Sequence, residues 1–309
     1  MQDKNLKGHA ALLVAYIIFG LNIPVVKVVF SSSEVSAIAL TFFRMAGAAL
    51  LFWITSLFTK REAVVKRDLF LLFLASLFGV LINQITFIEG LSQTSPVDAG
   101  IIATMAPLMT MILAAFFLKE PVTWKKVIGV FIGATGALLL ILNSNESANE
   151  EASIAGNFLC VLSGLSFAIY LTLFKQLILR YSAVTLMKWM FLFATVCYLP
   201  LCWQDVALIN YAAISFAVYL HIAFVVTLAT FFSYMLIPVG QKLLRPTIVS
   251  MYNYLQPVVS SIVAIAIGID SFGWVKGGAA TLVFIGVYVV TSSKSRAQMD
   301  AEKTVLKLE

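Results

Sequence analysis

The sequence predicts an all-α integral membrane protein whose ten transmembrane helices form two inverted five-helix repeats. Three observations lead to this fold class. The chain is 61% hydrophobic and 12% charged, with a mean hydropathy of +0.97, whereas soluble domains carry about 25% charged residues. Ten apolar segments are long enough, or nearly so, to cross about 30 Å of hydrocarbon. The chain also resembles itself at a spacing near 150 residues.

The ten segments are separated by short polar connections. A membrane helix needs roughly 20 mostly apolar residues, and the fifth segment reaches that length when it is extended back to Trp124. Runs such as Leu69–Val80 do not alternate apolar and polar residues, which excludes the strands of a membrane barrel. The predicted spans are Ala10–Phe30, Ile38–Phe58, Leu69–Leu91, Val97–Leu118, Val127–Leu142, Ile154–Leu179, Val184–Trp203, Ile214–Val239, Thr247–Ile267 and Val275–Ser292.

Basic residues predict the orientation. With the N-terminus inside, 17 of the 21 Lys and Arg residues fall in inner segments, and only Lys27 and Lys276 fall at outer ends. The loop Asn143–Ser153 has three acids and no base, as an outer loop should. We therefore expect a multi-pass protein of the bacterial inner (plasma) membrane, with both termini and the tail 293–309 in the cytoplasm. The scattered basic residues do not suggest nucleic acid as a partner.

The repeat divides the chain into residues 8–142, which hold the first five helices, and residues 154–292, which hold the last five. Sliding Thr94–Leu142 onto Leu244–Ser292 gives seven identities in 49 positions. Because five is odd, the second copy must enter the membrane from the opposite face. Secondary transporters have this arrangement and bind substrate near the midplane between the halves. The matched residues include Pro96 with Pro246, Pro107 with Pro257, Trp124 with Trp274 and Gly136 with Gly286.

Several stretches resemble a known family. FGLNIPVVK, Arg44 within LTFFRMAGAALLF, and GLSQTSPVDAGIIATMAPLMTMILAAFFLKEPVTWKKVIGVFIGATGALLL resemble the EamA branch of the drug/metabolite transporter superfamily. The resemblance covers His9 to Ser292 as two copies, although Met190 stands at the counterpart of Arg44 in the second copy. It implies ten helices, alternating access, a central cavity, and a peripheral position for the fifth and tenth helices. Members export amino acids, metabolites and toxic compounds, so the resemblance does not name a substrate.

Polar residues inside the predicted spans are candidates for a substrate site, because polar groups favour the interior of the bundle over lipid. The alternative is interhelical hydrogen bonding, worth about 0.6 kcal/mol per bond. We expect the set as a whole to line a central cavity. The candidates are Asn22, Asn83, Gln84, Tyr170, Tyr234, Asn253, Tyr254 and Gln256.

Other residues are candidates for ion coupling or for movement. Glu89, Asp98 and His221 are titratable groups at membrane level and could take part in proton coupling. Pro107 and Pro257 fall near mid-bilayer, where each frees a backbone carbonyl four residues back and could act as a hinge. Arg44 must pair or reach the interface, and Glu89 or Asp98 could be its partner, although it could instead hold substrate.

The function that these features favour is secondary active transport of small organic metabolites, with export of amino-acid-like or drug-like solutes by alternating access. A membrane channel and a membrane-embedded enzyme remain alternatives. The sequence has no H-E-x-x-H, G-x-S-x-G, P-loop or Cys/His metal spacing, so we expect no enzyme, cofactor or metal. Expected partners are the small-molecule substrate, the lipid bilayer and a possible second copy. Gly129, Gly133 and Gly136 form a small-residue face suited to packing within the monomer or in a dimer.

The charge distribution leads to a direct test of the topology. In a single-cysteine series, a thiol at Asn149 should react with an impermeant reagent from outside the cell. A thiol at Arg61 should react only after the membrane is permeabilised. Reversed accessibility at either site would contradict the predicted orientation.

Overall fold

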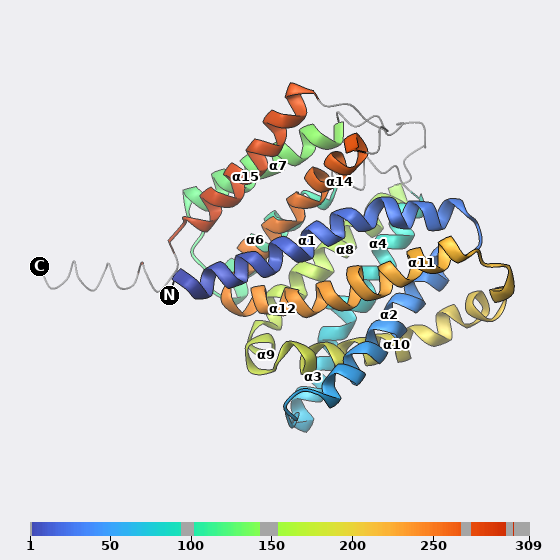
Figure 1. Cartoon of the computed structure of the whole chain (residues 1–309). Coiled ribbons are helices and arrows are strands. Elements are labelled where there is room, and N and C mark those ends of the chain that lie inside the picture. Colours follow the sequence, from blue (N-terminus) through green and yellow to red (C-terminus); the bar gives the residue numbers. More distant parts are fainter. Residues whose placement is uncertain (1, 94–101, 143–153, 267–272, 295–298, 300–309) are drawn as a thin grey trace, which may run out of the picture.

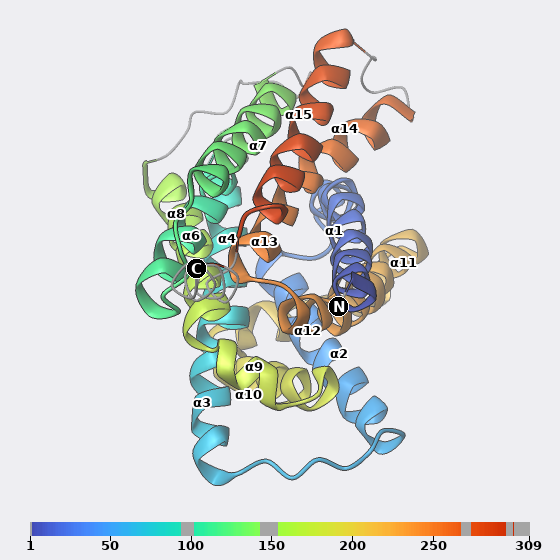
Figure 2. The same ribbon diagram turned by 90° about the vertical axis from the view of Figure 1, so that its left-hand side faces the viewer.

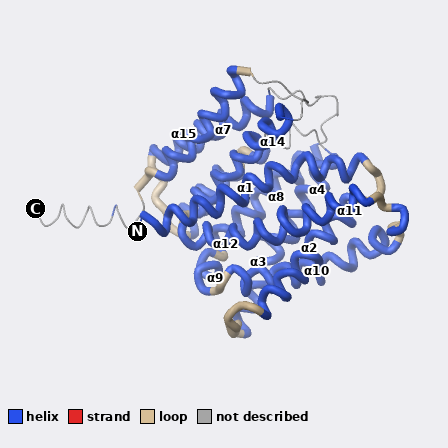
Figure 3. The backbone as a smooth tube through the Cα atoms, in the orientation of Figure 1, coloured by secondary structure: helices blue, strands red, loops and turns tan. Residues whose placement is uncertain are grey.

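The computed structural model describes residues 2–93, 102–142, 154–266, 273–294 and 299, and all regular secondary structure within these ranges is helical (Figure 3). The first half of the chain contains α1 to α7, with gaps in the numbering. Its elements are α1 (Gln2–Ser31), α2 (Ala37–Leu57), α3 (Lys66–Ser76), η1 (Leu77–Leu81), α4 (Ile82–Gln93), α6 (Ala106–Phe117) and α7 (Trp124–Leu142).

The second half repeats this order. Its elements are α8 (Ile154–Leu173), α9 (Lys175–Arg180), α10 (Ala183–Ala207), η2 (Tyr211–Ala213), α11 (Phe216–Phe224), η3 (Val225–Phe232), α12 (Ser233–Leu243), α13 (Pro246–Met251), η4 (Tyr252–Tyr254), α14 (Leu255–Ala266) and α15 (Trp274–Thr291). The helices α3, η1 and α4 are continuous and make the third span. The eighth span joins α11, η3 and α12 in the same way, and the ninth joins α13, η4 and α14.

The packing follows the repeat. Helix α1 packs against α12 and α14, and its counterpart α8 packs against α4 and α6. The helices that are equivalent between the halves also meet each other, α2 with α10 and α7 with α15 (Figure 1). This exchange of partners is what a two-fold relation between the halves produces. The fold is therefore the predicted all-helical membrane bundle of two inverted repeats.

Eight of the described helices, counted as continuous spans, are long and apolar enough to cross a membrane. The fourth and ninth spans are missing from that set because each is interrupted. Thr104 and Met105 form a turn just ahead of α6, and the 3-10 segment η4 separates α13 from α14. Pro107 and Pro257 each follow such an interruption within three residues. A proline removes one helical hydrogen bond and crowds the preceding turn, which accounts for both breaks.

Several predicted boundaries were wrong by a few residues. Helix α1 begins at Gln2 and α10 runs to Ala207, whereas the sequence predicted Ala10 and Trp203. The sixth span ends at Leu173 and the chain restarts as α9, so it does not continue to Leu179. Ser36 and Ser182 begin α2 and α10 by accepting a hydrogen bond from the amide three residues on, which satisfies an amide that the helix leaves unpaired.

The start of α1 and the end of α15 lie at the same end of the bundle (Figures 1 and 2). An even number of crossings requires this arrangement. The connections that the sequence assigns to one side also meet there. Glu62 accepts hydrogen bonds from the backbone and hydroxyl of Ser182, and Arg245 donates to the carbonyls of Ser293 and Lys294. We call this end, which carries most of the Lys and Arg side chains, the basic end.

Helices α7 and α15 form a pair at one side of the bundle, where α14 also contacts α7 (Figure 2). Their contact is backbone against backbone. A Cβ added at Gly136 would lie 2.6 Å from the carbonyl oxygen of Ala279, and one added at Gly286 would lie 2.5 Å from the amide nitrogen of Gly133. The predicted glycine face therefore packs within the monomer. Gly278 is not part of this contact, since a Cβ there would meet nothing within 4 Å.

This geometry predicts opposite effects for two substitutions. Gly136→Ala should lower the thermal unfolding temperature in detergent, because backbone atoms cannot move aside cheaply and overpacking costs about 1–3 kcal/mol. Gly278→Ala is the matched control in the partner helix, and it should be neutral or gain about 0.5–1 kcal/mol. Equal unfolding temperatures for the two variants would contradict the close packing.

Candidate functional site

The candidate residues meet where the two halves face each other. Gln84 on α4 donates from Nε2 to the hydroxyl of Tyr234 on α12 at 3.3 Å, and both side chains are buried. Phe19 on α1 and Phe191 on α10 lie edge-on to the Tyr234 ring, with ring centroids 6.0 and 5.0 Å away. Four spans of both halves thus meet around Tyr234. We call this group of residues the central site.

Tyr170 and Asn83 are held in contacts between helices. Tyr170 on α8 donates its hydroxyl proton to Oε1 of Gln241 on α12 at 3.1 Å. Asn83 on α4 donates to the carbonyl and the hydroxyl of Ser163 at 3.1 and 3.0 Å, and Ser163 donates back to the Asn83 carbonyl. The Asn83 side chain therefore binds α4 to α8, which was the alternative to substrate contact.

The ninth span contributes a contact that joins the two interruptions. Tyr254 lies in η4, and its hydroxyl donates to the Thr104 carbonyl at 2.8 Å. Thr104 belongs to the turn ahead of Pro107, so this hydrogen bond joins the two interruptions directly. The sequence predicted free carbonyls at Ala103 and Asn253, whereas the Tyr254 contact is made to Thr104, one residue later. Asn253 accepts a hydrogen bond from Gln256 at 3.2 Å.

Two π segments occupy equivalent places in the halves, η1 (Leu77–Leu81) and η3 (Val225–Phe232). Their widened turns leave carbonyls that need other donors, and hydroxyl groups provide them. Ser166 of α8 donates to the Phe78 carbonyl at 2.8 Å, and Thr230 donates to the Val225 carbonyl at 2.7 Å. Such segments inside α-helices are frequent at functional sites. The sequence analysis missed both, since the hydroxyl-bearing residues were their only signal.

Three buried polar atoms on α1, α4 and α12 have no hydrogen-bond partner within the described residues. They are Oδ1 of Asn22, Oε1 of Gln84 and Nε2 of Gln241. Buried polar atoms are nearly always paired, with the protein, with water or with a ligand. Of these, Gln84 Oε1 belongs to the side chain that donates to the Tyr234 hydroxyl. Gln241 follows Gly240, which lies against Leu12 of α1, about 15 Å along the helix axis from Asn22. Among the described residues, no group of three His, Cys, Asp or Glu side chains could hold a metal ion.

Two of the three coupling candidates lie within the described residues, on different helices. Glu89 accepts a hydrogen bond from Gln93 at 2.8 Å on α4. His221 is half-buried on α11, and its Nδ1 has no partner in the described part of the chain. Asp98 lies outside the described residues. Arg44, for which Glu89 or Asp98 was considered as partner, instead donates from Nε to the Thr230 hydroxyl at 3.2 Å.

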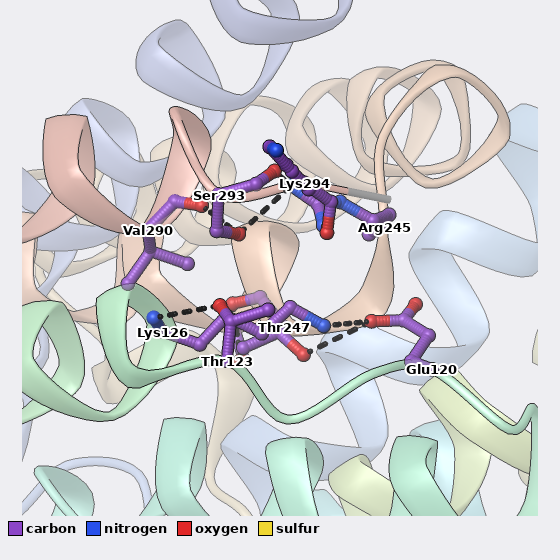
Figure 4. Close-up of polar contacts among 9 residues, drawn as sticks. Glu120, Thr123, Lys126, Arg245, Thr247, Val290, Ser293 and Lys294 are labelled. Carbon is purple, nitrogen blue, oxygen red and sulfur yellow. Dashed lines mark hydrogen bonds and ion pairs between the residues drawn. The ribbon is translucent and has the colours of Figure 1, made fainter. Parts of the chain in front are cut away.

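At the basic end, Glu120 links the halves (Figure 4). It pairs with Lys126 at 2.7 Å and accepts a hydrogen bond from Thr247, at the start of α13, at 3.5 Å. Lys175 donates to the carbonyls of Gln241 and Leu244. Glu62 also connects the halves at the basic end. Burial raises the pKa of its carboxyl, but hydrogen bonds from Thr185 and Ser182 and the positive charge of Lys242 lower that pKa, and the net result lies below its usual value.

Comparisons with known proteins agree with this geometry. The model of the EamA-like transporter family matches residues 6–142 and 154–292. An uncharacterized transporter of Archaeoglobus fulgidus is 30% identical over 59% of this chain and 62% of its own length. An uncharacterized inner membrane transporter of Salmonella typhimurium is 22% identical over 96% of this chain and 98% of its own.

Two further matches are a transporter named for its solute and a protein of known crystal structure. An S-adenosylmethionine uptake transporter of Rickettsia bellii is 25% identical over 57% of this chain and 56% of its own. One crystal structure of a protein superimposes with a TM-score of 0.76, covering 94% of this chain and 98% of its own. At 16% sequence identity, that likeness shows the fold alone.

Two inverted repeats with a polar site between them define a multi-pass membrane transporter. The family model covers both halves, so the chain belongs to the EamA-like transporter family. It is therefore a transporter and not an enzyme.

The contact between the two helix breaks can be tested with one hydroxyl group. Tyr254→Phe should lower the unfolding temperature, because it removes a buried hydrogen bond between the halves, worth about 0.5–1.5 kcal/mol. Tyr288→Phe is the control, since the Tyr288 side chain is 74% exposed on α15. Thermal unfolding of both variants in one detergent gives the comparison. A Tyr254→Phe variant as stable as Tyr288→Phe would show that the contact carries no stability.

Proposed function

We propose that the chain is a secondary active transporter that moves small organic metabolites by alternating access around the central site. We further propose that it exports amino-acid-like or drug-like solutes. The observation that carries this proposal is the buried contact of Gln84 with Tyr234 across the two halves, where Gln84 Oε1 has no partner within the described residues. Transporters built from inverted repeats bind substrate in this position.

In this proposal, the substrate touches the side chains whose polar atoms remain open. Asn22, Gln84 and Tyr234 contribute directly, and Tyr170 contributes through Gln241. Asn83 serves mainly to hold α4 against α8, because two of its hydrogen bonds go to Ser163. Asn253, Tyr254 and Gln256 shape the site from the ninth span, next to the break before Pro257.

The proposed movement uses the paired interruptions as hinges. Pro107 and Pro257 each follow a break within three residues, so a segment on either side can rotate while its helical hydrogen bonds stay intact. Opening the basic end would require Glu120 to release Thr247, and the hydroxyl of Tyr254 to release Thr104. Both contacts are single hydrogen bonds between halves, which suits a contact that is made and broken in each transport cycle.

Coupling to protons is the least developed part of the proposal. Glu89 is preferred over Asp98, because an acid in the first turn after Pro96 is also explained by the helix N-terminus. His221 is a second candidate, since its Nδ1 is buried without a partner in the described part of the chain.

We place the protein in the bacterial inner membrane with both termini in the cytoplasm. The distribution of Lys and Arg supports this orientation, and the Salmonella relative is named as an inner membrane transporter. The substrate and the lipid bilayer are its partners. A homodimer stays a prediction, and the glycine face of α7 is not available for it because α15 covers that face.

Solute counterflow in proteoliposomes tests the function. A panel of radiolabelled amino acids, nucleosides, S-adenosylmethionine and amphiphilic drugs is offered from both sides, because the Rickettsia relative is named for uptake and we propose export. We expect saturable exchange of at least one solute, with an imposed pH gradient driving accumulation in wild type and not in Glu89→Gln. Coupling predicts that Glu89→Gln retains equilibrative exchange.

The same preparation distinguishes the alternatives. Currents far above the rates of carriers, without exchange, would identify a channel. Loss of exchange together with a lower unfolding temperature in Glu89→Gln would identify a structural role for that carboxyl. Absence of exchange for every solute in the panel would contradict the proposed substrate class.

A further inference from the structure

Arg44 is a buried cation at the boundary between the halves. It lies on α2, and 9% of its surface is exposed. Its Nε donates to the hydroxyl of Thr230, which belongs to η3 in the opposite half and is fully buried. Tyr234 comes four residues after Thr230 in the same span, about one helical turn along, so its ring starts near the Thr230–Arg44 contact. Arg44 therefore adjoins the central site from a span that the sequence analysis did not assign to the cavity.

The charge of Arg44 is not balanced within the described residues. Lys126 and Asp68 are also buried, and each has an opposite charge beside it, Glu120 at 2.7 Å and Arg180 at 2.5 Å. Arg44 has its one hydrogen bond to Thr230 and no ion pair in the described part of the chain. A charged side chain at the centre of a membrane helix costs about 2.5–3.5 kcal/mol on insertion scales. A function that requires the positive charge of Arg44 would explain why a destabilising residue is present at this position.

The fold itself does not need a guanidinium at this position. Arg44 comes eight residues after the serine that caps α2, and Met190 comes eight residues after the serine that caps α10. Met190 is completely buried, and its Cε would lie 3.0 Å from a Cβ placed on Gly79 of η1. Each residue thus packs against the π segment of the opposite half. A neutral thioether fills the place in one half, so packing alone does not explain the charge in the other.

The neighbours of Arg44 complete a site for an anion. Tyr234 accepts a hydrogen bond from Gln84, which leaves its own proton without an acceptor in the described part of the chain. A guanidinium and a tyrosine O–H are both donors, and hydrogen bonds from them to a carboxylate are strengthened by charge. Gln84 Oε1 is an acceptor without a partner. It could take a hydrogen bond from an N–H or O–H group elsewhere on the same solute.

We propose that Arg44 recognises a carboxylate of the transported solute, so that the substrates of this protein are organic acids or zwitterions. This inference rests on the proposed transport function and narrows its substrate class. Bound solute would neutralise Arg44 at the midplane, where an unpaired cation is costly. The Thr230 hydroxyl positions the guanidinium, and the Tyr234 hydroxyl provides a second donor.

The test compares an acid with its neutral amide. We compare purified wild-type protein with the variants Arg44→Met, Arg44→Lys and Met190→Leu. Each is unfolded thermally in about 10–20 mM sodium benzoate, benzamide or sodium chloride. A ligand stabilises the folded state to which it binds. We expect benzoate to raise the unfolding temperature of wild type and of the Met190→Leu control by about 2–4 °C over benzamide and chloride. Arg44→Lys should keep part of this shift.

Arg44→Met copies the residue of the second half, so it should fold with an unfolding temperature in chloride equal to or above that of wild type. It should lose the difference between benzoate and benzamide. Absence of that difference in wild type, or the same difference in Arg44→Met, overturns the proposal. If Arg44→Met loses stability in chloride, Arg44→Gln replaces it, because its amide keeps a neutral N–H donor for the Thr230 hydroxyl. An Arg44→Gln variant that is also unstable assigns Arg44 to structure and overturns the proposal.

Counterflow measurements distinguish failure of the anion site from failure of the proposed transport function. A wild-type protein that exchanges only neutral or cationic solutes retains the proposed function and contradicts the anion site. A protein that binds benzoate through Arg44 but exchanges no solute retains the anion site and contradicts the transport function.

Discussion

The architecture depends on one constraint of the bilayer: a backbone group that leaves the helical ladder must find another partner inside the protein. This chain leaves the ladder in two pairs of places, the π segments η1 and η3 and the breaks before Pro107 and Pro257. Hydroxyl groups donate hydrogen bonds to carbonyls at these places. Ser166 donates to Phe78 in η1, and Tyr254 donates to Thr104 beside the first break. Both donors come from the opposite half, so the irregular backbone and the contact between the repeats are the same feature.

The repeat also explains why polar side chains gather without forming a closed network. Two copies of one fold bring equivalent helices together, but their residues have diverged. Gln84 and Tyr234 now meet across the halves, while Gln84 Oε1 and Gln241 Nε2 lack partners in the described part of the chain. A structural network would be expected to satisfy all its members, because an unpaired buried group costs more than a hydrogen bond contributes. In the proposed function, a solute supplies the partner that Gln84 Oε1 lacks.

Most of the fold could be predicted from the sequence, because apolar length, basic connections and matched prolines are local signals. Ten spans, two repeats and the glycine packing of α7 followed from them. The partner of Arg44 did not, since nothing near Arg44 in the chain indicates Thr230, 186 positions away. The sequence did not indicate that Asn83 bonds to Ser163, because side-chain direction depends on how α4 is rotated against α8. The π segments were also missed, because the signal depends on contacts between helices. The hydroxyl that donates to η1, for example, belongs to Ser166 on α8.

The close contact of α7 with α15 has a consequence for how the protein is made. Helix α7 ends at Leu142, but α15 begins only at Trp274, near the end of the chain. At a synthesis rate of about 5–20 residues per second, α7 waits on the order of ten seconds for its partner. During that interval its glycine-lined face meets lipid or another early helix. The span that completes the first half therefore leaves the ribosome long after α7. A nascent chain arrested before Trp274 would contain a finished α7 without the surface that it fits.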